Sequence, residues 1–170
     1  MALSQFAGGC GPREPALVNP GMSTANRFGT GFSDAGADAA VVADPGVDLQ
    51  SARPVGKTFL SRGHFAGRWT AEVSTNETAS QAYANLAAST KFVVGSLLVK
   101  RHASTKAAAP VTTFAMVKRD AGFFPEGGDW EYVVLDAEGR LEERGKLAPC
   151  ARCHAEATGD WVFGLPIEAR

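Results

Sequence analysis

The 170-residue sequence lacks the charge excess and the long apolar runs that define several large classes of protein. Its formal net charge is -1, whereas a nucleic-acid-binding protein is expected to show a basic excess or a basic stripe. The longest apolar run, 92–99, is broken by Gly95 and Ser96 and is far shorter than the roughly 18 residues of a membrane span. We therefore expect neither a nucleic-acid partner nor a transmembrane span.

The N-terminal segment also lacks the charged region and the long apolar region of a complete secretion signal. Cys10 nevertheless follows Ala-Gly-Gly and precedes a Gly/Pro-rich stretch, which resembles the end of a lipoprotein signal; the alternative is a disordered tail with a chance cysteine. Residues 1–54 are rich in Gly, Ala, Pro, Ser and Asp, a composition that buries too little apolar surface to offset its chain entropy. We predict a tail or an irregular wrap over 1–54 and a folded domain over 55–170.

Apolar periodicity within the second segment predicts an α+β domain. Residues 68–73 alternate as a half-buried strand does, and Asn76 is suited to cap a helix that continues to about residue 88. Further strands are predicted at 94–101, 111–119 and 130–136, and a short helix near Pro149 or Cys150. Without regular strand-helix alternation, this order favours a mostly antiparallel β-sheet with flanking helices and a C-terminal helix.

The C-terminal helix would carry the motif Cys150-x-x-Cys153-His154. The chain has only three cysteines and three histidines, so chance is the weakest of four explanations; the others are haem attachment, a metal site and a redox dithiol. In c-type haem attachment two thiols add to the haem vinyl groups, and the adjacent histidine reaches the iron. This explanation gives all three residues of the motif a role.

The other two explanations need features that the sequence does not supply. A zinc site needs four ligands, and the remaining candidates, Cys10, His64 and His102, are scattered along the chain. A thioredoxin-like dithiol is expected after an early strand and at the head of a long helix, whereas this motif lies near the C-terminus. We therefore expect one covalent haem c, with His154 as the iron ligand.

The residues around the motif resemble the cytochrome P-460 family. The resemblance lies in VGSLLVKRH at 94–102, MVKRDAGFFPEGGDWEYVVLD at 116–136, CARCH at 150–154 and WVF at 161–163. It covers roughly residues 64–163, and its most specific element is the combination of the Cys-x-x-Cys-His motif with the upstream Phe-Pro-Glu-Gly-Gly-Asp-Trp turn. It implies a mostly antiparallel sheet flanked by helices, one pentacoordinate c-type haem and, commonly, a homodimer.

Two branches of that family differ at one lysine. The cytochrome P-460 branch oxidises hydroxylamine with nitric-oxide chemistry and carries a bond from a lysine to the porphyrin edge, and Lys100 falls where that lysine is expected. The cytochrome c′-beta branch binds nitric oxide and carbon monoxide without this bond. Taken without the resemblance, Lys100 is a residue that ends a strand and extends its ammonium group into water.

The resemblance also implies a distal carboxylate that assists proton transfer, and here the sequence departs from the family pattern. The position aligns near Phe114 or Ala115, neither of which is an acid or a base. Phe114 and Met116 alternate onto one face of their strand, where they form either an apolar lid over the iron or ordinary core. An apolar lid favours binding of nitric oxide or carbon monoxide, because proton-coupled oxidation needs a positioned base. Glu72, His102 or Glu131 would replace that base only if the fold brings one close.

These residues lead to one expected function with two alternatives. We expect a monohaem c-type cytochrome with an open distal iron site, an oxidoreductase that oxidises hydroxylamine or processes nitric oxide and passes electrons to a soluble redox partner. The alternatives are a non-catalytic gas-binding protein of the c′-beta type and a plain electron-transfer cytochrome with Met116 or His102 as sixth ligand. Because bacterial c-type haem attachment takes place outside the cytoplasm, we expect a periplasmic location, with a lipid anchor at Cys10 as an option.

Overall fold

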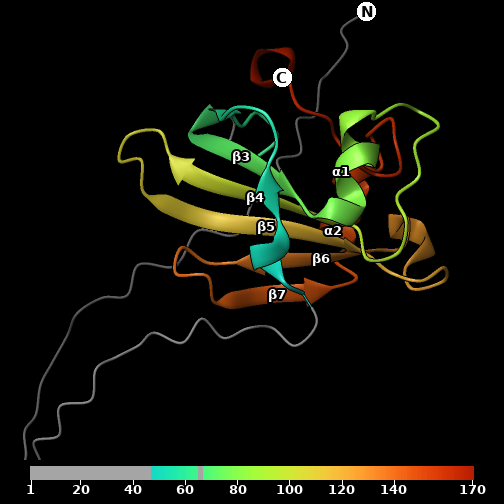
Figure 1. Ribbon diagram of the computed structural model, residues 1–170. Coiled ribbons are helices and arrows are strands. Elements are labelled where there is room, and N and C mark those ends of the chain that lie inside the picture. Colours follow the sequence, from blue (N-terminus) through green and yellow to red (C-terminus); the bar gives the residue numbers. More distant parts are fainter. Residues whose placement is uncertain (1–46, 65–66) are drawn as a thin grey trace, which may run out of the picture.

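The central element of the computed structural model is a seven-stranded antiparallel β-sheet. The structure describes residues 47–64 and 67–170. Strands β3 to β7 form a meander in chain order, and β1 and β2 both pair with the outer edge of β3 (Figure 1). The strands are β1 Arg53–Pro54, β2 Phe59–Leu60, β3 Trp69–Thr75, β4 Leu97–Ser104, β5 Pro110–Lys118, β6 Trp130–Leu135 and β7 Leu141–Gly145.

Two α-helices accompany the sheet in the part of the chain that is described, α1 at Glu77–Ala84 and α2 at Ala148–His154. Neither is long and apolar enough to cross a membrane. The side chain of Asn76 caps α1 by accepting a hydrogen bond from the Ala79 N–H at 3.1 Å. The prediction of an α+β fold with a mostly antiparallel sheet and a C-terminal helix is confirmed.

The two faces of the sheet bury different sets of side chains. On the face that we call the helical face, residues from α1 and α2 pack on alternate strand residues: Val73, Leu98, Met116, Trp130 and Tyr132. The opposite face buries a second cluster: Leu97, Val99, Ala115, Val117, Val133 and Leu135, together with Val47 and Ala52 from the segment before β1. The site described below lies on the helical face.

Several elements differ from the sequence-based expectation. Strand β7 was not among the strands predicted from the sequence, and it pairs with β6 at the sheet edge. An edge strand is held by backbone hydrogen bonds and has no buried face to reveal its apolar alternation. Strand β4 begins at Leu97, later than expected, because 93–96 form a turn in which the Ser96 N–H donates to the Val93 carbonyl at 3.0 Å.

The described chain begins inside the segment for which we predicted a tail or an irregular wrap. Within it, Leu49–Ser51 form a 3₁₀ turn, β1 pairs with the end of β3, and Val47 and Ala52 are buried. Cys10, the candidate lipid-attachment residue, lies outside the described residues.

Candidate functional site

The short helix α2 presents Cys150, Cys153 and His154 close to the helical face of the sheet. Pro149 lies in its first turn, where the missing N–H and the fixed φ of proline cost nothing. Ala151 is buried in the core cluster of the helical face, and Cys150 packs against that cluster. The motif is therefore anchored to the helical face through Ala151 and Cys150.

The tautomer of His154 follows from a single hydrogen bond. Its Nδ1 lies 2.8 Å from the carbonyl oxygen of Trp161, and because a carbonyl only accepts, Nδ1 carries the hydrogen. Burial lowers the pKa of His154, and the nearby charge of Lys100 lowers it further, against the opposing effect of the Trp161 carbonyl. The imidazole is thus neutral, with an unprotonated Nε2 that is chemically suited to ligate a metal.

Two aromatic rings enclose the His154 imidazole. The rings of Tyr132 and Phe163 lie 5.6 Å and 5.4 Å from it, both in edge-on arrangements. The Tyr132 hydroxyl is buried without a hydrogen-bond partner among the described residues, and burial raises the pKa of Tyr132, as do Cys150 and Cys153. Tyr132 therefore stays protonated and fixes the ring by packing.

Lys100 lies on β4 in the middle of the helical face. Its neighbours across the sheet are Val73 on β3 and Phe114 on β5, and its Nζ is 5.6 Å from the centre of the Phe59 ring. Burial lowers the pKa of Lys100 to about 8, although the nearby Cys153 acts to raise it. At neutral pH a fraction on the order of one in ten of the amine is therefore unprotonated.

Two imidazoles, which we call the imidazole pair, lie beside Lys100: His102 is buried and His64 is half-buried. His64 stacks on Phe114 with ring centres 4.5 Å apart, and its ring meets that of His102 edge-on at 5.1 Å. His102 Nε2 lies 3.2 Å from the Ser61 hydroxyl, and the Nδ1 atoms of both imidazoles are buried without a hydrogen-bond partner among the described residues.

Both members of the imidazole pair are neutral at pH 7. Burial lowers the pKa of His64 to about 4 and that of His102 to about 3, and in both cases the charge of Lys100 adds to the effect. Each neutral imidazole has a lone pair that can accept a proton, but the burial that lowers the pKa values also makes both groups weak bases.

The other candidates from the sequence lie elsewhere. Glu72 pairs with Arg101, next to the Val73–Lys100 pair, and so it projects from the opposite face. Glu131 also lies on the opposite face, where it accepts hydrogen bonds from Arg119 and Arg144. Of the three residues considered as replacements for the missing carboxylate, only His102 lies on the same face as Lys100.

Met116 lies on the helical face but deep in its core. It is buried opposite Leu98 and Tyr132, within the cluster that also contains Phe124 and Trp130. Phe114, by contrast, contacts both imidazoles. Within 47–64 and 67–170 no group of three or more His, Cys, Asp or Glu side chains is arranged to hold a metal ion, so the zinc explanation gains no support.

The turn at 124–130 packs directly against the motif. A Cβ on Gly128 would lie 2.5 Å from Trp161 Cε3, and one on Gly127 would lie 3.2 Å from the Cβ of Ala151. Gly128 also has φ +65°, which favours glycine. The Phe-Pro-Glu-Gly-Gly-Asp-Trp turn and the Cys-x-x-Cys-His motif therefore form one structural unit, in which the glycines let Trp161 and α2 approach.

Sequence reasoning missed two functional contacts of this site. The acceptor for His154 is the main-chain carbonyl of Trp161. Every residue has such a carbonyl, so the identity of the residue does not indicate which one accepts. Ser61, the partner of His102, precedes β3 in a segment without periodicity. The WVF stretch at 161–163 marks Trp161 as part of the family resemblance, but it does not indicate that the Trp161 carbonyl accepts the hydrogen bond from His154.

Comparison with known families gives one finding. The family Cytochrome P460 matches residues 66–164, which is more than half of the chain and includes strands β3 to β7 and helix α2. No curated protein matches the sequence.

Proposed function

The chain belongs to the cytochrome P460 family of c-type haem proteins, and from this premise we propose that it is a monohaem cytochrome with an open distal iron site that oxidises hydroxylamine or processes nitric oxide. Cys150 and Cys153 would hold the haem through thioether bonds, and His154 Nε2 would ligate the iron. The haem, when bound, would supply one-electron redox chemistry and a coordination position for a small nitrogen compound.

The residues present fit such a group. The hydrogen bond from His154 Nδ1 to Trp161 leaves Nε2 as the only ring nitrogen with a free lone pair, which a histidine iron ligand requires. Cys153 is close enough to Lys100 to influence its pKa, so the thiols of α2 and the amine of β4 belong to one site. This juxtaposition supports a site in which Cys150, Cys153 and His154 would hold the haem and Lys100 would stand close to it.

The observation that supports the hydroxylamine-oxidising assignment is the partly buried position of Lys100 on the helical face. A bond to the porphyrin edge requires a neutral amine, and the pKa of about 8 makes that form accessible near neutral pH. Lys100 Nζ would exchange one hydrogen for a bond to a porphyrin carbon, which also loses a hydrogen. Two protons and two electrons leave, and a peroxide that is reduced to water would accept them.

Proton acceptance on the distal side would fall to the imidazole pair. Oxidation of hydroxylamine releases protons, and neither Phe114 nor Ala115 can accept one. His102 is buried and His64 is half-buried, and both are neutral and adjacent to Lys100. Because their low pKa values make them weak bases, they would pass a proton on and not retain it. Ser61 would then connect His102 with the segment that precedes β3.

A second function is favoured by the position of Phe114. Phe114 is the cross-strand neighbour of Lys100 and its ring stacks on His64, so an apolar side chain stands where a carboxylate would otherwise be expected. An apolar side chain there would suit non-catalytic binding of nitric oxide or carbon monoxide, as in the c′-beta branch. Under this alternative Lys100 would carry no bond to the haem.

The cellular setting follows from the same proposal. Covalent haem attachment in bacteria takes place after export, so we propose a periplasmic protein that passes electrons to a soluble redox partner. Attachment to a lipid through Cys10 and assembly as a homodimer are further parts of the proposal.

The deciding experiment is an intact mass and an absorption spectrum of the denatured holoprotein. We expect the mass of one haem, reduced by the two hydrogens lost in the lysine bond, and we expect Lys100→Ala to restore those hydrogens and to change the spectrum. The control is Lys106→Ala, because Lys106 is an exposed lysine just after β4. A mass without haem would refute the assignment, and a spectrum that does not respond to Lys100→Ala would refute the bond.

Turnover then separates the functions. Rapid oxidation of hydroxylamine with an added electron acceptor supports the enzyme. Binding of nitric oxide without turnover supports the gas-binding alternative, and an unreactive low-spin iron supports an electron carrier with a sixth protein ligand.

A further inference from the structure

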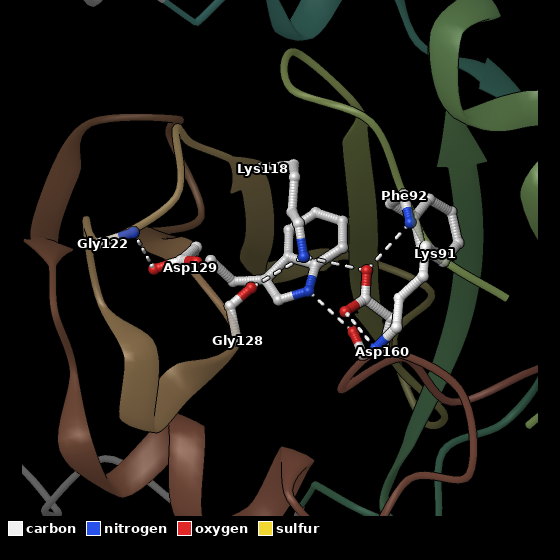
Figure 2. A network of polar contacts seen from close by, with 8 residues as sticks. Lys91, Phe92, Lys118, Gly122, Gly128, Asp129 and Asp160 are labelled. Carbon is white, nitrogen blue, oxygen red and sulfur yellow. Dashed lines mark hydrogen bonds and ion pairs between the residues drawn. The ribbon is translucent and has the colours of Figure 1, made fainter. Parts of the chain in front are cut away.

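Asp160 is a buried carboxylate at the centre of a polar network that joins the loop after α2 to the end of β5. Its side chain is 4% exposed, and Oδ2 accepts hydrogen bonds from Lys118 Nζ at 2.8 Å and from the Phe92 N–H at 2.9 Å (Figure 2). Its main-chain oxygen accepts from Trp130 Nε1 at 2.7 Å. Three segments far apart in the sequence are thus joined to this one residue.

The residue that follows Asp160 is Trp161, whose carbonyl accepts the hydrogen bond from His154 Nδ1. Asp160 and Trp161 have φ of +50° and +63°, in the left-handed region that non-glycine residues rarely adopt. Two such residues in succession persist only when surrounding contacts hold them in place. The contacts of Asp160 are those that fix the loop, and they thereby set the direction of the Trp161 carbonyl.

Lys118 completes the anchor from the side of the sheet. Its side chain is 13% exposed, and Nζ donates to the Gly128 carbonyl at 2.8 Å as well as to Asp160. Gly128 in turn lies against the Trp161 ring. Lys118 therefore connects the end of β5, the 124–130 turn and the loop after α2. A second cation, Lys91, is 75% exposed and lies 3.7 Å from Asp160 Oδ1, so it adds little.

We infer that Asp160, with Lys118 as its counterion, is a positioning residue for His154: the buried pair holds the Trp161 carbonyl in line with Nδ1–H and so sets the orientation and the basicity of the imidazole. The inference rests on the proposed function in one respect, that His154 ligates the iron. A strong hydrogen bond from Nδ1 increases electron density on Nε2, and a more basic ligand stabilises ferric over ferrous iron.

A purely structural role for the pair would predict something different. A buried ion pair is by itself weak support for stability, since apolar residues of similar volume often replace it at no cost. Breaking the pair would then lower stability and leave the electronic properties of the imidazole unchanged. The positioning role predicts that both change.

The test uses the holoprotein with Asp160→Asn, which keeps the shape and removes the charge that holds Lys118. We expect the iron–histidine stretching frequency of the ferrous form, measured by resonance Raman spectroscopy, to fall below the wild-type value and the midpoint potential to shift positive. Lys118→Arg keeps a cation at the pair and is expected to retain most of the wild-type frequency. The matched control is Asp136→Asn, whose ion pair with Arg140 lies in the β6–β7 turn.

The possible results separate the positioning role from the proposed function. A frequency and a potential that stay at their wild-type values in Asp160→Asn, or that shift equally in Asp136→Asn, overturn the positioning role alone. If Asp160→Asn does not fold, the double variant Lys118→Met with Asp160→Asn leaves no unpaired buried charge and carries the same expectation. A wild-type holoprotein without an iron–histidine band refutes ligation by His154, and with it both proposals.

Discussion

Lys100 and Phe114 are direct neighbours across strands β4 and β5, so the amine and the phenyl ring leave the same face of the sheet side by side. Lys100 is the feature typical of the hydroxylamine-oxidising branch, and Phe114 stands near the position where that branch has a carboxylate that assists proton transfer. Under the proposed function, the balance between oxidation and gas binding would depend on this cross-strand pair and on the imidazoles packed against Phe114.

Replacing Phe114 by alanine tests whether the ring covers the iron. We expect carbon monoxide to bind the ferrous protein about tenfold faster, which corresponds to ~1.4 kcal/mol of barrier, because the substitution removes the ring beneath His64. The measurement is flash photolysis or stopped-flow mixing with carbon monoxide.

The control for that experiment is Val133→Ala. Val133 is buried on the opposite face, so its truncation should lower stability by roughly 1–3 kcal/mol and leave the binding rate unchanged. Equal binding rates in Phe114→Ala and in wild type would show that Phe114 is ordinary core.

His102 should make the protein sensitive to mild acid. The pKa of His102 is about 3 in the folded protein and about 6.5 when unfolded, so between these values the unfolded chain binds the extra proton. Stability therefore rises with pH through this window and is lost as the pH falls below about 6.5. From pH 7 to pH 5 the loss attributable to His102 is about 2 kcal/mol.

Urea unfolding at pH 7 and at pH 5 measures this effect. His102→Gln keeps a hydrogen-bonding group near Ser61 and cannot titrate, so its stability should depend less on pH than that of the wild type. His64→Gln should reduce the pH dependence of the stability by a similar amount, because burial also lowers the pKa of His64, to about 4. Identical pH dependence in all three proteins would contradict the burial of neutral imidazoles.

The parts of this structure that could be predicted from the sequence are those encoded locally. Helix α1 has its cap at Asn76, and α2 has Pro149 in its first turn and a motif of adjacent residues. Strand β5 has buried residues on both faces, and the turn residues that bound it located it within a residue at each end. In each case the signal and the structure lie in the same short segment.

The parts that could not be predicted depend on long-range contacts or on the main chain. The stacking of His64 on Phe114 joins two residues that are separated in the sequence by strands β3 and β4. Strand β7 gave no apolar pattern because its side chains are largely exposed. The carbonyl of Trp161 is an acceptor because of two left-handed residues, and non-glycine residues at such φ leave no mark in the sequence.

Gly128→Ala should disturb the site through Trp161. The new Cβ would lie 2.5 Å from Trp161 Cε3, and the backbone has φ +65°. We expect stability to fall by more than the roughly 1 kcal/mol that the left-handed backbone alone costs, and we expect the iron–histidine frequency to change because Trp161 carries the acceptor for His154.

Gly139→Ala is the matched control for that variant. Gly139 has φ +80° and open space around the position of a Cβ, so it tests the backbone cost without a clash. Thermal unfolding and resonance Raman spectra of both variants should show similar backbone penalties and an altered frequency only in Gly128→Ala. An iron–histidine frequency that changes in both variants, or in neither, would contradict the prediction that the packing of Trp161 sets the geometry of His154.

Glu131 should stabilise the sheet without influencing the haem site. It accepts hydrogen bonds from Arg119 and Arg144 on the face opposite Lys100. Although burial acts to raise the pKa of Glu131, the two guanidinium groups outweigh it and hold the pKa below its usual range. Its contribution is therefore present above the unfolded pKa of about 4.3 and is lost as the pH falls through the folded pKa.

Glu131→Gln separates this contribution from that of the imidazoles. At pH 7 the variant should lose about 2 kcal/mol, because charge-assisted hydrogen bonds become neutral ones, while the absorption spectrum stays that of the wild type. Between pH 7 and pH 5 the variant should keep the wild-type slope, since Glu131 stays ionised and the histidines still titrate. Below pH 4 its curve should converge on that of the wild type; a constant gap at every pH would mean that Glu131 acts by packing and not by charge.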